Sequence, residues 1–349
     1  MYEQLTSWPN LLLAYRKASK GKRGKANVAA FEYLLEDNLC RLQEELRRQT
    51  YRPGSYHSFF IHEPKRRLIS AAPFGDRVVH HALCNLIAPI FERGFIEDSY
   101  ANRLGKGTHR ALDRCQQIAR RCPYVLQCDI RQFFPSIDHA LLRAILRQKV
   151  SNPQVRWLID QILAGGAAIL SEEYEMVWFP GDDLLAALRP RGLPIGNLTS
   201  QFWANCYLNP FDHFVKRELH CRNYLRFVDD FLLFSDDKDQ LWAWRAAIVE
   251  RLARLRLTIH AQAQPQRVSK GTSFLGFRVF ADRRRLKRRK CIHVRRRFHH
   301  LLGDYAAGTI SLDELDASVQ GWVNHARYGN TVGLRKAILT SQVISPGTM

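Results

Sequence analysis

The feature that most constrains the fold is a pair of adjacent aspartates, Asp229 and Asp230, set between two apolar, aromatic-rich segments. The run over 224–234 reads Tyr-Leu-Arg-Phe-Val-Asp-Asp-Phe-Leu-Leu-Phe. Because strand residues alternate between faces, a tight bend here holds the carboxylates at its tip, where they repel each other unless a divalent cation binds. An ordinary turn is the alternative, since Asp tolerates bend geometry and bonds its own backbone. The dipeptide alone leaves both interpretations open.

A third carboxylate, Asp129, lies a hundred positions before Asp229. The apolar stretch that begins at Tyr124 predicts a buried strand with Asp129 at its end, and Asp138 is predicted to cap a helix over 140–149. Only tertiary structure can bring Asp129 to the aspartate pair. Three carboxylates in one place are what two-metal phosphoryl transfer requires, because hard divalent cations prefer oxygen ligands and stabilise both the attacking and the leaving oxygen.

Four blocks of the sequence, in order, resemble successive motifs of a reverse transcriptase. They are Asp129 with Phe133 and Phe134, the segment 192–201 (Gly-Leu-Pro-Ile-Gly-Asn-Leu-Thr-Ser-Gln), the tetrapeptide Phe-Val-Asp-Asp over 227–230, and Phe-Leu-Gly-Phe over 274–277. Upstream, 63–69 and 76–79 resemble the fingers motifs of bacterial members. The resemblance extends from about Leu11 to Arg335, which is nearly the whole chain.

This resemblance implies an α+β fold, a right-hand polymerase whose antiparallel palm sheet is backed by helices. The expected divisions are N-terminal helices and fingers over 1–122, a palm over 123–280 with a hairpin insertion at about 165–192, and a basic helical thumb over 281–349. The implied activity is RNA-directed DNA polymerisation, with template RNA, a cDNA or primer strand and dNTPs as partners. Two Mg²⁺ ions are expected on Asp129, Ile130, Asp229 and Asp230, of which the three aspartates are catalytic.

The segment 195–201 narrows the choice within the superfamily. Group II intron and retroviral enzymes usually carry Gln-Gly at its start and Ser-Pro at its end, whereas this chain has Ile195-Gly196 and Ser200-Gln201. That form is similar to the reverse transcriptases of diversity-generating retroelements. These enzymes copy a template-repeat RNA, misincorporate opposite template adenines, deliver the copy to a variable gene, and work with a small helical-bundle accessory protein, Avd. Defence-associated or group II-like repair enzymes, and a catalytically silent RNA-binding scaffold, are the alternatives.

Residues for nucleotide binding follow from the same motifs. Lys65 and Arg67 are expected to grip the triphosphate, although a solvated charge run is the plainer interpretation. An aromatic steric gate against the 2′ hydroxyl is assigned to Phe134, beside Phe133, and core packing is the alternative. Gly196 and Ile195 are expected at the nascent pair. Because the family's usual Gln is replaced by Ile195, a polar constraint on base-pair geometry is lost, which predicts reduced fidelity.

Residues that contact the template or primer form the second set. The resemblance assigns this role to Asn197, Ser200, Phe227, Val228, Leu275, Gly276 and Arg288. In a primer-grip hairpin, Gly276 lets the backbone approach the primer strand, whereas a plain core strand is the other interpretation of the aromatics around it. A second aspartate pair, Asp182-Asp183, follows Pro-Gly and is interpreted as a surface turn, which makes it the main competitor for the catalytic assignment.

The charge and the cysteine content limit which partners and which cellular location are expected. The chain has 53 Lys plus Arg and 33 Asp plus Glu, a net charge of +20, with basic clusters at 16–25, 283–290 and 295–297. A polyanion is the natural ligand, and its binding should weaken steeply with salt. The eight cysteines include no Cys-x-x-Cys pair, so neither a zinc site nor a disulfide framework is expected. No apolar run is long enough to cross a membrane, and the first ten residues lack signal-peptide features, so a cytoplasmic location is expected.

Overall fold

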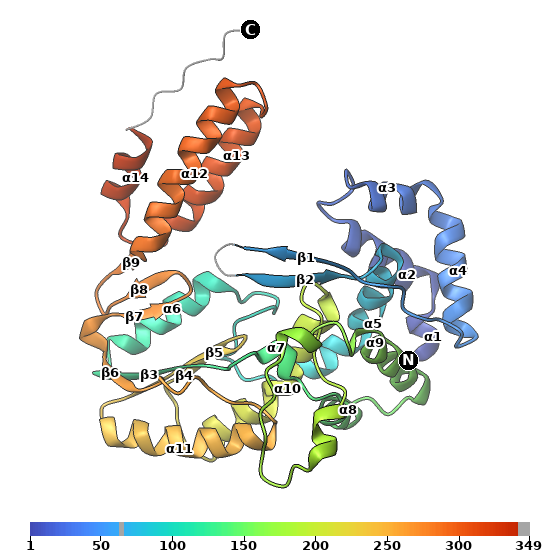
Figure 1. Ribbon diagram of the computed structural model, residues 1–349, viewed down its shortest axis with the longest axis horizontal. Helices are drawn as coiled ribbons and strands as arrows, with labels where there is room; N and C mark the ends of the chain where they lie inside the picture. The colour runs from blue at the N-terminus through green and yellow to red at the C-terminus, as the bar shows by residue number, and fades with distance from the viewer. Residues whose placement is uncertain (63–65, 341–349) are drawn as a thin grey trace.

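The computed structural model describes residues 1–62 and 66–340, which form helices and three antiparallel sheets (Figure 1). The N-terminal part is helical, with a two-stranded hairpin inserted before its longest helix. Its elements are α1 (Tyr2–Leu5), α2 (Trp8–Ser19), α3 (Ala26–Tyr33), α4 (Leu35–Arg47), β1 (His57–Ile61), β2 (Arg67–Ala71) and α5 (Phe74–Glu92). Helices α3 and α4 are separate because the backbone breaks at Leu34, where φ is −115° and ψ is 47°.

A four-stranded antiparallel sheet forms the centre of the molecule. Its strands lie in the order β4 (Tyr224–Phe227), β5 (Asp230–Ser235), β3 (Tyr124–Asp129) and β6 (Pro265–Arg267). Helix α11 (Lys238–Arg254) packs on β3, β5 and β6, and α6 (Thr108–Ala119) packs on β4. The strand predicted to end at Asp129 and the two strands that flank the aspartate pair are therefore neighbours in one sheet.

The alternation of side chains along these strands builds two hydrophobic cores, one on each face of the sheet. Leu126, Phe231 and Leu233 join the larger core with the N-terminal helices. Val125 and Leu232 join the second core, which includes α6 and the C-terminal strands. With both faces covered, the strands read as nearly continuous apolar runs, and a polar side chain at the end of such a strand is conspicuous.

Between β3 and β4 the chain forms helices and one irregular segment. The helices are α7 (Phe133–Ser136), α8 (His139–Arg147), α9 (Pro153–Gly166) and α10 (Leu198–Arg217). The predicted cap of α8 is confirmed, since the Asp138 carboxylate accepts the N–H of Leu141 at 3.0 Å. The hairpin expected at about 165–192 is not formed: after α9 ends at Gly166, the rest of that segment contains two short 3₁₀ helices, η1 (Ser171–Glu173) and η2 (Leu184–Leu188). Pro-Gly turns the chain there, but ion pairs rather than strand pairing hold the loop.

The C-terminal part stands at one end of the molecule, above a small sheet (Figure 1). This sheet comprises β7 (Thr272–Phe274), β8 (Phe277–Val279) and β9 (Arg284–Leu286), and after a 3₁₀ turn, η3 (Val268–Lys270), it continues from β6. Three helices follow, α12 (Arg288–Ala306), α13 (Leu312–Ala326) and α14 (Val332–Leu339). Trp322 of α13 packs edge-to-face on Phe298 of α12, with ring centroids 5.5 Å apart, and this contact joins the two helices.

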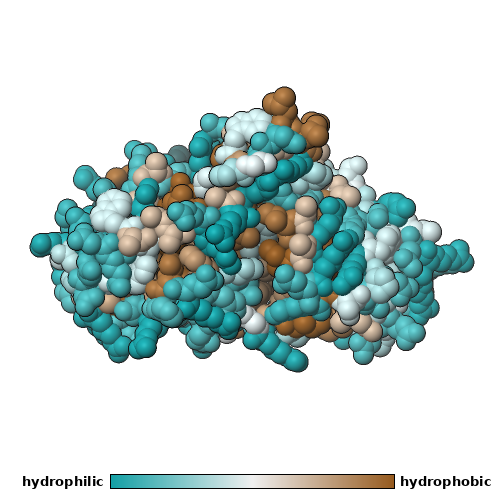
Figure 2. Space-filling model, turned by 90° about the horizontal axis from the view of Figure 1, so that it is seen from below, coloured by the Kyte–Doolittle hydropathy of each residue, from teal (hydrophilic) through white to brown (hydrophobic). Residues whose placement is uncertain are grey.

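The surface agrees with the charged composition. Figure 2 shows that the face seen from below is mostly hydrophilic, with smaller hydrophobic areas between charged side chains. None of the described helices is both long and apolar enough to cross a lipid bilayer. All eight cysteines are free thiols, and six of them are buried, which agrees with the expectation that they pair in no disulfide.

Candidate active site

The sheet register places Asp129 directly opposite Asp230. Strands β3 and β5 pair antiparallel with Asp129 facing Asp230 at the end of the ladder, and the ladder is extended by the N–H of Ile130, which donates to the carbonyl of Asp229 at 3.1 Å. Directly opposed residues in such a pair have Cα atoms about 4.5–5.5 Å apart. Asp129 and the aspartate pair, a hundred positions apart in the sequence, therefore lie at the same end of the sheet.

The two adjacent aspartates are presented by a two-residue turn. Phe227 of β4 pairs with Asp230 of β5, so that Val228 and Asp229 form the loop. Val228 has a φ of 58°, in the left-handed region that β-branched residues rarely occupy. The turn therefore carries local strain, and contacts elsewhere must hold it. Phe227 is half-buried and packs against the second core, which fixes the strand before the turn.

Burial and mutual repulsion make both carboxyl groups of the turn weak acids. Burial, and then the charge of Asp129, raise the pKa of Asp229 to about 6. Burial also raises the pKa of Asp230 to about 7, and the charges of Asp129 and Asp229 add to the rise. Positive charge opposes these shifts, from Arg67 at Asp229 and from Lys287 at Asp230. The site thus holds more negative charge than its surroundings neutralise, which is what a divalent cation would relieve.

The structure shows what the carboxylates contact within the chain. The side-chain amide of Gln127, two residues before Asp129 on the same face of β3, donates to both oxygens of Asp230 at 3.0 and 3.2 Å. The carboxylate of Asp129 is half-exposed, and its Oδ1 lies 3.9 Å from Nε2 of His260. His260 also donates its backbone N–H to the carbonyl of Asp129 at 3.1 Å. Gln127 and His260 were not predicted; the period-two alternation of β3 was the available signal for Gln127.

The donor set suits Mg²⁺, although the side chains are not drawn together around one point. No three His, Cys, Asp or Glu side chains within residues 1–62 and 66–340 are grouped so that they could hold a metal ion. Opposed Asp129 and Asp230, with Asp229 beside them, nevertheless supply the carboxylate oxygens that hard cations prefer. Ile130 has a hydrocarbon side chain with no donor atom, so only its backbone carbonyl could serve as a ligand.

Of the predicted nucleotide-binding residues, Arg67 is the one whose charge acts on the aspartate pair. Arg67, the first residue of β2, is exposed and close enough to Asp229 for its charge to lower the pKa of that carboxyl. Lys65 lies outside the described residues. Phe133 is buried in the larger core, whereas Phe134 is partly exposed and meets Phe133 edge-to-face with ring centroids 5.3 Å apart. Of the two rings, Phe134 is therefore the one that keeps a surface for a ligand.

The segment 192–201 leads into α10 and lies against β2. The carbonyl of Ile195 accepts the N–H of Ser70 at 2.8 Å. Gly196 has a φ of 116°, and a Cβ there would lie 3.1 Å from Cγ2 of Ile69, so a side chain is disfavoured by both backbone and space. The glycine thus allows this segment to lie close against the β1–β2 hairpin.

Asn197 and Ser200 have their side chains inside the protein. Asn197 is 2% exposed; its amide donates to the carbonyls of Ser70 at 2.8 Å and Pro194 at 3.1 Å and accepts the N–H of Ala72 at 3.2 Å. These bonds give Asn197 a structural role that the sequence did not indicate. Ser200 is 3% exposed. Contact of these two residues with the template stays a prediction.

The turn between β7 and β8 consists of Leu275 and Gly276, both with positive φ, 45° and 89°. A Cβ on Gly276 would meet the flexible end of the Lys290 side chain in α12, which could move, so the positive φ is the stronger reason for glycine here. Approach of the primer to this turn stays a prediction. Arg288, the first residue of α12, is exposed.

Opposed, incompletely neutralised carboxylates beside a cation on a neighbouring hairpin suit an enzyme that transfers phosphoryl groups with divalent metal ions. Comparison with known proteins identifies the family. Residues 61–279 match the model of the reverse transcriptase (RNA-dependent DNA polymerase) family, a match that includes all three aspartates and more than half of the chain. The chain belongs to this family and is an RNA-directed DNA polymerase.

Individual relatives are distant. Protein YkfC of Escherichia coli is 24% identical over 301 residues, which cover 74% of this chain and 75% of YkfC. The group II intron-encoded protein LtrA of Lactococcus lactis is 24% identical over 183 residues, 52% of this chain and 28% of LtrA. A 91 kDa protein in the cob intron of Schizosaccharomyces pombe is 28% identical over 153 residues, 44% of this chain and 17% of that protein. The chain thus matches only a fraction of the intron proteins.

Proposed function

We propose that this reverse transcriptase makes cDNA from a template RNA by two-metal nucleotidyl transfer at Asp129, Asp229 and Asp230. The observation that carries the proposal is the register of β3 against β5, which sets Asp129 opposite Asp230. Two Mg²⁺ ions held by these carboxylates and the carbonyl of Ile130 would activate a primer 3′ hydroxyl and offset charge on the triphosphate. The protein's own part is to hold the carboxylates in place at the end of the sheet.

The three parts of the chain then take the roles of a right hand. Residues 1–122 would supply the fingers, with Arg67 and Lys65 toward the triphosphate. Residues 123–280 would form the palm around the central sheet, and 281–349 the thumb. The position of α12–α14 above the β7–β9 sheet, on the same side as the β1–β2 hairpin, supports this division (Figure 1). A cytoplasmic location is part of the proposal.

A metal-dependent primer-extension assay tests the activity. The purified chain, an RNA template with an annealed DNA primer, dNTPs and Mg²⁺ should give full-length cDNA, and chelation of Mg²⁺ should stop synthesis. A chain that binds the RNA tightly but extends no primer, with Mg²⁺ or Mn²⁺, would instead be the silent scaffold. Omitting one dNTP should stop extension at the corresponding template base, which controls for untemplated addition.

The narrower proposal is a role in mutagenic copying within a diversity-generating retroelement, with an Avd-like helical-bundle partner. It is supported by Ile195-Gly196 and Ser200-Gln201 in place of the commoner dipeptides. Because Ile195 supplies no polar side-chain group, Ile195→Gln should restore a contact worth about 1–3 kcal/mol and raise discrimination at template adenines about tenfold or more. Sequencing of cDNA products measures this, and equal error rates in both proteins would contradict the assignment of Ile195.

Genomic context separates the biological alternatives. A template and variable repeat pair with a reading frame for a small helical bundle would favour the retroelement, whereas their absence would favour a defence or repair enzyme.

Phe134→Ala tests the steric gate in the primer-extension assay. The variant should incorporate ribonucleotides, and continued exclusion of them would leave Phe134 as a packing residue.

A further inference from the structure

Arg226 lies in β4, two residues before the turn that carries Asp229, and is almost completely buried, at 1% exposure. All five of its side-chain N–H donors have partners. Nε and Nη2 donate to the two oxygens of Asp212 in α10 at 2.8 and 2.7 Å, and Nη2 also donates to the hydroxyl of Ser99 at 3.2 Å. Nη1 donates to Asn205 at 3.2 Å. The remaining donor of Nη1 reaches the carbonyl of Val228 at 2.8 Å.

That last bond acts on the strained residue of the turn. Val228 has a φ of 58°, and its carbonyl belongs to the peptide unit that joins it to Asp229. An L-residue with a branched side chain leaves this conformation readily unless something fixes it. A guanidinium that is itself held by a buried carboxylate is a rigid donor, because its planar fork has a fixed geometry. The orientation of the peptide before Asp229 is thus tied to Asp212 on a different element.

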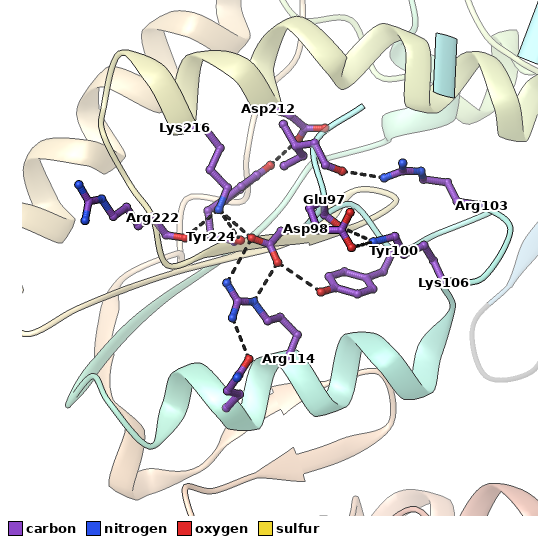
Figure 3. Close-up of polar contacts among 12 residues, drawn as sticks. Glu97, Asp98, Tyr100, Arg103, Lys106, Arg114, Asp212, Lys216, Arg222 and Tyr224 are labelled. Atoms are coloured by element: carbon purple, nitrogen blue, oxygen red, sulfur yellow. Dashed lines mark hydrogen bonds and ion pairs between the residues drawn. The ribbon is translucent and has the colours of Figure 1, made fainter. Parts of the chain in front are cut away.

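The carboxylate that anchors Arg226 is itself anchored. Asp212 is fully buried and also accepts the hydroxyl of Tyr224 at 2.7 Å. A neighbouring network surrounds Asp98, whose carboxylate accepts Arg114 at 2.9 Å and Lys216 at 2.8 Å (Figure 3). Asp98 contacts the Arg226 strand through its backbone carbonyl, which accepts the N–H of Arg226 at 2.9 Å, and none of its side-chain bonds reaches the turn. The network around Arg226 therefore contacts the turn, and the side-chain network around Asp98 does not.

We propose that Arg226 and Asp212 form a clamp that positions the catalytic turn: the guanidinium holds the Val228 carbonyl, keeps Val228 in its left-handed conformation, and so directs Asp229 toward Asp129. This inference rests on the proposed catalytic role of the aspartates. Arg226 is a positioning residue, since it touches neither substrate nor metal. It acts on the turn and does not contribute to the affinity for nucleic acid.

Arg226→Lys is the first test, because lysine keeps the charge but cannot make five fixed hydrogen bonds. The single-turnover extension rate at saturating dNTP and Mg²⁺ should fall about 10- to 100-fold, the usual effect of a displacement near 1 Å. The Kd for the template–primer duplex should stay within about twofold of wild type, because the clamp makes no contact with nucleic acid. Arg114→Gln, which breaks the neighbouring network at Asp98, should change the rate less than about twofold.

Val228→Gly separates positioning from a general loss of core packing. Glycine adopts a positive φ without penalty, so in the Arg226→Lys background it should restore about five- to thirtyfold of the lost rate. If Arg226 only stabilises the core, Val228→Gly should not restore the extension rate, because glycine adds conformational freedom to the chain and supplies no packing. If Arg226→Lys does not fold by circular dichroism, Asp212→Asn takes its place and should show a smaller rate loss with the same rescue.

Three outcomes are distinguishable. A wild-type chain that extends no primer contradicts the proposed function itself. An active wild type with an unimpaired Arg226→Lys variant contradicts the clamp alone. A rate loss that Val228→Gly fails to relieve also contradicts it and leaves Arg226 as a core residue.

Discussion

The chain contains two adjacent aspartate pairs, and their surroundings differ in almost every respect. Asp229 and Asp230 lie on a turn between buried strands, opposite a third carboxylate, and burial raises the pKa values of both. Asp182 lies in the irregular segment before α10, where its 1%-exposed carboxylate pairs with Arg189 at 3.0 Å and Arg256 at 2.7 Å.

The second aspartate of each pair shows the same contrast. Asp183 accepts the N–H of Ala186 at 3.2 Å and caps η2, which is ordinary turn chemistry. The amide of Gln127 donates to both oxygens of Asp230, and the charge of Lys287 lowers the pKa of that carboxyl. One dipeptide thus serves two purposes: direct ion pairs with two arginines hold Asp182 in a loop, whereas Asp229 and Asp230 keep raised pKa values although Arg67 and Lys287 are near. The surrounding charge, rather than the Asp-Asp sequence, makes the candidate site.

The largest expected effect comes from removing a carboxylate of the turn. Asp229→Asn should lower RNA-templated extension by at least about 1,000-fold, because several kcal/mol of transition-state stabilisation through the metal ions is lost. Steady-state extension rates measure this, and circular dichroism should show an unchanged fold. Activity within tenfold of wild type would contradict the assignment of the site to this turn.

The pH dependence of metal binding sharpens the contrast further. Metal ligands must be ionised, and the pKa of Asp230 is about 7, so the ionised fraction rises steeply between pH 6 and 8. The Mg²⁺ concentration for half-maximal extension should therefore fall about tenfold over this range. Asp182→Asn should show the same profile as wild type. A flat profile would show that the carboxylates are already charged at pH 6.

Without metal, the same shifted groups should destabilise the folded chain at high pH. A carboxyl whose folded pKa lies above its unfolded value binds more protons when folded, so stability decreases as pH rises from about 4 to 7. In EDTA at pH 8, Asp230→Asn should then raise the free energy of unfolding by roughly 1–3 kcal/mol. Denaturant titrations at pH 8 and pH 5 measure this, and the gain should shrink at pH 5. An equal gain at both pH values would point to packing rather than charge.

The smallest effect on activity is expected at the other aspartate pair. Asp182→Asn should leave extension within about twofold of wild type, because its partners are Arg189 and Arg256, neither of which belongs to the site at the end of the sheet. Loss of a buried carboxylate that pairs with two partly exposed arginines should cost about 1–2 kcal/mol of stability, measured by thermal unfolding. An Asp182 variant that lost polymerisation while Asp229→Asn kept it would reverse the comparison.

Much of the local structure was predictable. The apolar run that ends at Asp129, the hairpin strands on either side of Asp229 and Asp230, and the Asp138 cap all formed as expected, because each depends on a few neighbouring residues. The hairpin expected at about 165–192 did not form, because weak local preferences there yield to packing and ion pairs.

Side-chain roles that depend on distant partners were less accessible. Nothing in the motif around Asn197 indicates that its amide binds Ser70 and Ala72, more than a hundred positions away. The motif around Gly276 does not indicate that Lys290 of α12 lies beside it, and approach of a primer strand there stays a prediction. Such assignments need the arrangement of whole elements, which motifs do not contain.

The sequence by itself determined the strands, the helix cap, the positive charge and the position of each aspartate along the chain, since these follow from short-range periodicity and composition. Only the tertiary structure decided that Asp129 lies opposite Asp230, that arginines neutralise Asp182, and that Arg226 holds Val228. The physical reason is that burial and Coulomb energy depend on which groups are close in space. Residues that are remote in the chain set those distances.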